Sequence, residues 1–137
     1  MNSERKCVIA VAGDLPVGLI LNAVAVLSVA IGHRVENITG GDVRDASGQI
    51  HVGIVNIPIP ILKATASEVK AIRAQALSAA DLLVVGMTET AQSARVYEEY
   101  AVQMSETMEE YLVYRAVALC GDKKAINKLT GSLSLYR

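Results

Sequence analysis

The stretch CVIAVAGDLPVGLILNAVAVLSVAIG, residues 7–32, carries the strongest fold signal in the chain. It begins with a run of β-branched and small apolar residues that closes at Gly13, which is typical of a strand buried on both faces. The turn up to Pro16 predicts a helix start, because proline early in a helix sacrifices no hydrogen bond. This helix is expected to end near Gly32. A buried strand that leads directly into a long apolar helix indicates an α/β domain.

Only two strongly polar side chains interrupt this stretch, Asp14 and Asn22. Asp14 follows the strand and is expected to cap the helix or to act as a general base. The helix around Asn22 is apolar on every side, so its amide should be covered and hydrogen-bonded. The partner of Asn22 stays open between a backbone group, Asp14 and a ligand.

Composition predicts one α/β domain over residues 1–137 with an aliphatic core. The chain has 137 residues, is 52% hydrophobic, contains no Trp or Phe and has five Tyr. Such an apolar chain is expected to bury further surface in a homo-oligomer, the simplest being a homodimer.

The net charge and the apolar segments of the chain indicate which partners and which cellular compartment to expect. Thirteen basic against fourteen acidic residues give a net charge of −1, so no nucleic-acid partner is expected, since such binding needs a basic face. The apolar run after Gly18 ends at Ile31, short of the ~20 residues of a spanning helix, so no membrane partner is expected. Cys7 and Cys120 fall in apolar runs and predict buried thiols in a reducing compartment, hence a cytoplasmic protein. No cofactor or metal is expected.

The rest of the chain alternates strands with helices. A capping box, Thr65 with Glu68, opens an amphipathic helix. The other predicted elements are strand-like segments at 50–57, 81–87 and 111–120, a helix over 90–104, and a last short helix ending near residue 131. We therefore predict a three-layer α/β/α sandwich with a mixed, mostly parallel central sheet of about four strands.

The C-terminal stretch TGSLSLYR, residues 130–137, follows a strand, a Gly and a short helix. In this it resembles the C-terminus of type II peptidyl-tRNA hydrolases, whose Thr-Gly-x-Leu-x-Leu-Tyr pattern has counterparts here. The closest likeness is to an uncharacterised bacterial family, domain of unknown function family 2000. The resemblance implies a peptidyl-tRNA hydrolase type II-like fold. The residues that match the Thr-Gly-x-Leu-x-Leu-Tyr pattern of the hydrolases are Thr130, Gly131, Leu133, Leu135 and Tyr136.

The chain departs from those hydrolases where their chemistry resides. They carry Lys, Gln and His along the first helix, whereas residues 19–26 here offer only Asn22. An Asp after their second buried strand is replaced by Thr88, and a longer segment, roughly 89–110, replaces their short link. The resemblance therefore implies a hydrolase-like scaffold that has lost its catalytic set.

A ligand site is expected where the buried strands end, because α/β proteins bind ligands outside the strand carboxyl ends. The turn of Thr88, Glu89 and Thr90 follows such a strand and is expected to share one pocket with Asp14 and Asn22. The alternative role for either threonine is N-capping of the next helix.

Two features outside that turn have an open interpretation. Tyr97 and Tyr100 stand at i and i+3 and are expected either to roof the pocket or simply to pack. Lys123 and Lys124 begin a helix and mark a possible anion site, the alternative being a solvated helix face.

Two functions follow from these residues. The first is binding of an unknown small molecule. The alternative is a divergent hydrolase of an aminoacyl or peptidyl ester, with Asp14 as the candidate catalytic residue and Thr88 recruited beside it.

Overall fold

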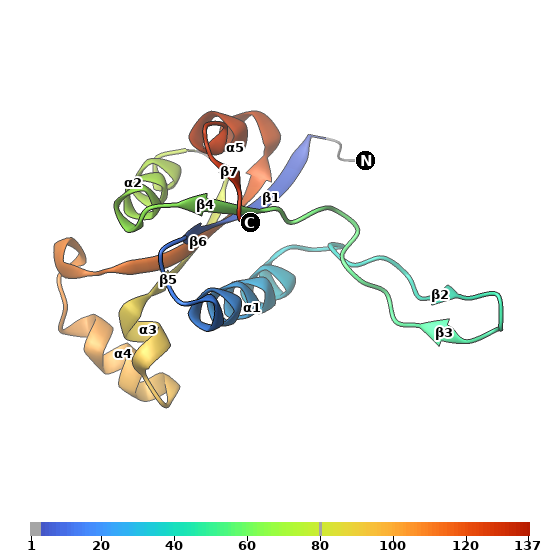
Figure 1. The fold of residues 1–137 in the computed structure, drawn as a ribbon, viewed down its shortest axis with the longest axis horizontal. Helices are drawn as coiled ribbons and strands as arrows, with labels where there is room; N and C mark the ends of the chain where they lie inside the picture. The colour runs from blue at the N-terminus through green and yellow to red at the C-terminus, as the bar shows by residue number, and fades with distance from the viewer. Residues whose placement is uncertain (1–3, 80) are drawn as a thin grey trace.

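The computed structural model describes residues 4–79 and 81–137, which form a mixed α/β fold (Figure 1). A five-stranded sheet has the order β5-β6-β1-β4-β7, and β2 and β3 form a separate hairpin. The elements in chain order are β1 (Arg5–Ala12), α1 (Val17–Arg34), β2 (Val43–Arg44), β3 (Ile50–His51), β4 (Ile61–Ala64), α2 (Ala66–Leu77), β5 (Leu83–Thr88), α3 (Glu89–Ser93), α4 (Tyr97–Ser105), the 3₁₀ turn η1 (Glu109–Tyr111), β6 (Tyr114–Asp122), α5 (Lys123–Thr130) and β7 (Ser134–Leu135).

Strand β1 is the centre of the sheet, as its apolar sequence predicts. Alternate residues face opposite sides, so Ile9 packs under α1 while Val8 packs among α2 and α5. Helix α1 therefore covers one face of the sheet, and α2 and α5 cover the other (Figure 1). The alternation of strands and helices correctly predicts these layers.

The predicted strand count and direction need correction. The sheet has five strands, because the two-residue β7 pairs with β4 and its short pattern gives little signal. "Mostly parallel" is also wrong for the pairings, since only β1 with β4 is parallel and the other three pairs are antiparallel. The reason is that β6 returns from α3 and α4 into the position between β5 and β1, antiparallel to both.

Three predicted elements also differ in detail. Strand β5 lies at the sheet edge and is only half-buried apart from Met87 and Thr88, whereas its apolar sequence predicts full burial. The helix predicted over 90–104 is interrupted at residues 94–96, where Ala94 and Val96 adopt extended backbone angles. The strand predicted over 50–57 is reduced to β3, two residues long.

The segment from Thr39 to Asn56 forms an arm that projects from the domain (Figure 1). Its strands β2 and β3 pair with each other and, among the described residues, with no strand of the main sheet. A bridge between Thr39 and Val55 closes its base. The arm is therefore an insertion between α1 and β4 in the chain, and its residues are not part of the hydrophobic core of the domain.

Helix α1 buries only one of its faces. Its buried residues point at the sheet, and the opposite face is open. By length and composition alone α1 is the one helix among the described residues that is long and apolar enough to cross a membrane, with 22% of it buried. The residues that point at the sheet are Ile20, Ala23, Leu27 and Ile31.

Candidate functional site

A pocket of about 500 Å³ opens between α1, the edge strand β5 and the helices α3 and α4. We call it the edge pocket. Among residues 4–79 and 81–137, β5 has no neighbouring strand on its outer side, and α3 and α4, which follow it, form part of the pocket wall. Its lining residues are Asn22, Val26, Leu27, Ala30, Val85, Gly86, Met87, Ala91, Gln92, Ala94, Arg95, Val96, Tyr97 and Tyr100.

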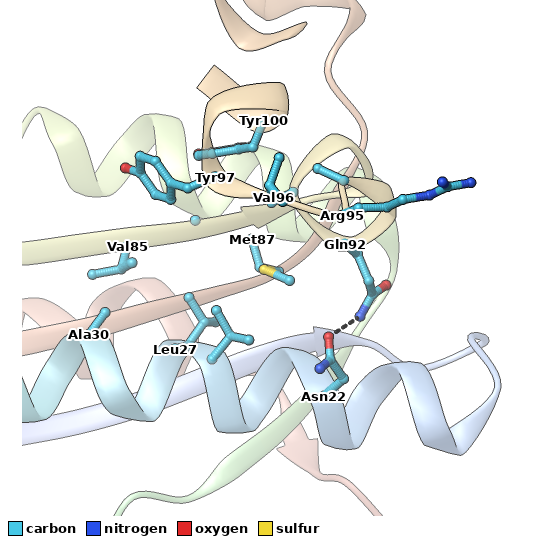
Figure 2. Close-up of a pocket in the computed structure, with 14 residues that line it drawn as sticks. Asn22, Leu27, Ala30, Val85, Met87, Gln92, Arg95, Val96, Tyr97 and Tyr100 are labelled. Carbon is cyan, nitrogen blue, oxygen red and sulfur yellow. Dashed lines mark hydrogen bonds between the residues drawn. The ribbon is translucent and has the colours of Figure 1, made fainter. Parts of the chain in front are cut away.

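The floor of the edge pocket is aliphatic. Leu27 and Ala30 come from one side of α1, and Val85 and Met87 from alternate positions of β5, so all four point into the same space (Figure 2). Leu27 and Met87 are already buried, so an apolar ligand on this floor would cover mainly the half-buried Ala30 and Val85, whose contact with water is unfavourable.

Two tyrosines form the roof. Tyr97 and Tyr100 lie on the first turn of α4, with their rings edge to face and the ring centroids 5.5 Å apart. The extended break at residues 94–96 turns the chain and sets α4 over the floor (Figure 2). Both expectations for this pair therefore apply, because the rings pack on each other and line the pocket.

Polar groups gather at one end of the pocket. Gln92 Nε2 donates to the carbonyl oxygen of Leu19 at 2.8 Å and to Asn22 Oδ1 at 3.2 Å (Figure 2). Because Asn22 presents its oxygen to Gln92, its own NH₂ group stays available as a donor. Arg95 adds a guanidinium at the same rim and extends outward from it.

The predicted burial of Asn22 is wrong, because this side chain is exposed. The outer face of this apolar helix is left uncovered by the described part of the chain, so its apolar sequence does not bury every side. Its partner is also a side chain far along the sequence, in α3, rather than a backbone group or Asp14.

The turn after β5 is stabilised from within. The Thr88 hydroxyl accepts from Ala91 N at 3.1 Å, so Thr88 is the predicted N-cap of α3. Glu89 pairs with Arg115 at 3.4 Å, and the Thr90 carbonyl accepts from Ala94 N and Ser93 Oγ. None of these three residues is among those that line the edge pocket.

Asp14 is exposed and lies at the carboxyl end of β1. The expected capping of α1 is wrong, because Pro16 is the N-cap residue and no side chain caps this helix. Strands β1 and β5 run in the same direction with β6 between them. Their carboxyl ends therefore lie at the same end of the sheet, two strand spacings or about 10 Å apart. The lining of the edge pocket includes Asn22 but not Asp14.

The model of a family described as "Protein of unknown function (DUF2000)" matches residues 5–137. The chain belongs to the DUF2000 family. This confirms the family expected from the sequence.

One solved structure has the same fold as this DUF2000 chain. It is a protein of unknown function, Atu0240 from Agrobacterium tumefaciens strain C58, with 20% sequence identity, a TM-score of 0.88 and 98% of each chain covered. At that identity the likeness establishes the fold alone. No curated protein matches the chain.

The basic residues at the start of α5 are both exposed. Asp122 is the N-cap of α5, and its carboxylate accepts from Ala125 N at 3.0 Å. A negative charge therefore already occupies the helix start beside Lys123 and Lys124, where an anion would bind. The anion site stays a prediction.

The two thiols of this DUF2000 chain are buried and free, as the sequence predicts. Cys7 and Cys120 are direct partners across β1 and β6. Lys123 N donates to the Glu4 carbonyl oxygen, and the alternation along the ladder then makes Cys7–Cys120 a non-hydrogen-bonded pair, the kind with the closest side chains. The hydrogen bond between the thiols and their burial raise the pKa of Cys120.

Sequence reasoning missed most of the edge pocket. Gln92, Arg95 and Met87 belong to no recognisable sequence motif. In sequence, the aliphatic and amide side chains of a pocket wall cannot be distinguished from those of an ordinary core or loop. The signal that could have found them is the long polar segment at 89–110 after an apolar strand, in which small residues precede Tyr97.

Proposed function

We propose that the chain binds a small, largely apolar molecule in the edge pocket. The observation that carries this is the combination of an aliphatic floor, a tyrosine roof and a few polar groups at one end. Small-molecule sites are typically concave and apolar with a small number of placed polar groups, and about 500 Å³ lies within their usual range.

The polar end of the pocket favours a ligand with a hydrogen-bond acceptor. The NH₂ group of Asn22 and the guanidinium of Arg95 are both donors, and Arg95 is positive. A carboxylate near Asn22 and the rim charge of Arg95 fits this arrangement, with its aliphatic or aromatic body on Ala30 and Val85.

A dye of this chemistry, 1-anilinonaphthalene-8-sulfonate, tests the proposal directly. We expect one dye per folded chain, with binding weakened about tenfold or more by Ala30→Leu, which fills the floor. The matched control is Ala71→Leu on the exposed side of α2, which should bind like the unaltered protein. Equal binding by both variants would refute the proposal.

The scaffold is proposed to be related to that of type II peptidyl-tRNA hydrolases with the catalytic set lost. The support is the sequence likeness at residues 130–137 and the absence of Lys, Gln and His from residues 19–26. With the thiols of Cys7 and Cys120 both free, a reducing compartment such as the cytoplasm suits the chain.

The alternative function, a divergent ester hydrolase, would need Asp14 and Thr88 to act together. The Thr88 hydroxyl is buried, accepts from Ala91 N and points its own proton at Met104 Sδ, 3.8 Å away. Because both of these contacts stabilise the fold, the hydroxyl is not free to act on a substrate. This favours ligand binding over hydrolysis.

A further inference from the structure

Two apolar surfaces of the chain have no cover among the residues that the structure describes. The first is the outer stripe of α1, formed by Val17, Leu21, Ala25 and Val29, which recur every four residues and so share one helix face. Leu21 is 64% exposed and Val29 75% exposed. From Val17 to Gly32 this helix carries no charged side chain.

The second surface is the arm, residues 39–56. Ile50, Val52 and Ile54 alternate along one side of it, and Val52 and Ile54 are 80% and 79% exposed. The side chains of Val43 and Val55 are exposed on the same arm.

The arm has little regular secondary structure to stabilise it by itself. Its ladder contains two residues on each strand, Val43–Arg44 and Ile50–His51, and an isolated two-stranded hairpin is marginally stable at best. A half-open hollow of about 290 Å³ lies on the arm and is lined by residues of both its sides, among them Gly40 and Val52. An apolar arm of this kind is stabilised when other apolar surface covers it.

We propose that a second copy of this chain covers both surfaces, in a symmetric dimer that buries the outer stripe of α1 and the arm of each protomer. Each chain carries both apolar surfaces. In a two-fold symmetric dimer, both surfaces of both protomers are therefore buried in one interface. The arm projects away from its own domain, which leaves it within reach of a partner and not folded on its own α1 (Figure 1).

The size of these surfaces agrees with a stable dimer. The 18 residues of the arm and the ten exposed residues of α1 make 28 residues per copy, within the roughly 20–30 per side of a standard interface. Their apolar centres and charged ends, such as His33 and Arg34 at the end of α1, match the apolar core and polar rim of such interfaces.

Light scattering during gel filtration at micromolar concentration tests the dimer. The unaltered protein should elute with twice the mass of one chain. Leu21→Asp on α1 and Val52→Asp on the arm should each raise the dimer dissociation constant about tenfold or more. Both side chains are exposed in the single chain, so circular dichroism should show that both variants fold.

The matched control is Leu77→Asp at the end of α2, where an equally large apolar side chain is 57% exposed on the other side of the sheet. It should remain dimeric. A monomeric unaltered protein, or a dimer that persists in either Leu21→Asp or Val52→Asp, overturns the proposal. So does flotation of the unaltered protein with phosphatidylcholine–phosphatidylglycerol vesicles, which would assign the stripe to a lipid surface.

Discussion

Gln92 Nε2 lies 3.2 Å from Asn22 Oδ1 and joins α3 to α1 across seventy positions of sequence. The same nitrogen donates to the Leu19 carbonyl oxygen at 2.8 Å. One amide therefore holds the polar end of the edge pocket together, because it satisfies two acceptors on one helix from another.

Removal of Gln92 should cost more than removal of Asn22. Gln92→Ala deletes both hydrogen bonds and should lower the free energy of unfolding by about 1–2 kcal/mol. Asn22→Ala leaves the bond to Leu19 and should cost less than about 1 kcal/mol. Urea denaturation of both variants checks the order, and an equal or larger loss for Asn22→Ala would contradict it.

Stability should fall at high pH because of Tyr114. Burial of its ring and the hydrogen bond to Glu109 Oε2 at 3.0 Å raise the pKa of Tyr114 above the usual 10.0. The unfolded chain releases this proton first, so the contribution to stability is complete below pH 10 and is lost as the pH rises through the folded value. Urea unfolding between pH 9 and pH 11.5 measures the decline.

Tyr114→Phe is the control for that decline, since it removes the hydroxyl and keeps the ring beside Arg73, whose Cζ lies 5.2 Å from the ring centroid. The variant should lose about 1 kcal/mol at pH 7 and show a shallower alkaline decline. An unchanged slope would assign the loss to other groups.

Gly53 should be required for the shape of the arm. A side chain there would collide with the carbonyl oxygen of Gly40, while the same addition at Gly41 meets nothing within 4 Å. Gly53→Ala should therefore speed tryptic cleavage after Arg44, and Gly41→Ala should not. In the monomeric Leu21→Asp background, the free energy of unfolding should change by no more than about 0.5 kcal/mol in either variant, because the arm lies outside the core of its own domain.

Cleavage at equal rates in Gly53→Ala and Gly41→Ala would show that the two sides of the arm do not approach closely.

Purified protein should not hydrolyse peptidyl-tRNA at enzyme-like rates. The first helix offers no Lys, Gln or His, and Asp14 is exposed and outside the edge pocket. Unaltered protein and Asp14→Ala should both release product at the rate of buffer. Turnover that disappears with Asp14→Ala would instead establish the hydrolase alternative.

Both thiols should resist modification in the folded chain. Cys7 and Cys120 are buried between α1 and the sheet, so a reagent such as 5,5′-dithiobis(2-nitrobenzoic acid) reaches them only when the structure opens. We expect labelling at least about a hundredfold slower than in urea-unfolded protein. Rapid labelling of one thiol in native protein would mean that this end of the sheet opens locally.

Local signals in the sequence determined the elements and their layers. The run at residues 7–12 became β1, Thr65 with Glu68 formed the predicted capping box, and the helix after Gly121 ends at Thr130. Each of these depends on side-chain periodicity or on hydrogen bonds within a few residues, which neighbouring sequence specifies by itself.

Only the tertiary structure decided where β5 and the two helices after it lie. The sequence of β5 is as apolar as a central strand, yet β6 separates it from β1 and leaves its outer edge open. The edge pocket and the bond between Gln92 and Asn22 exist because of that strand order. Strand order results from long-range pairing, since residues far apart in sequence meet only when the whole sheet assembles.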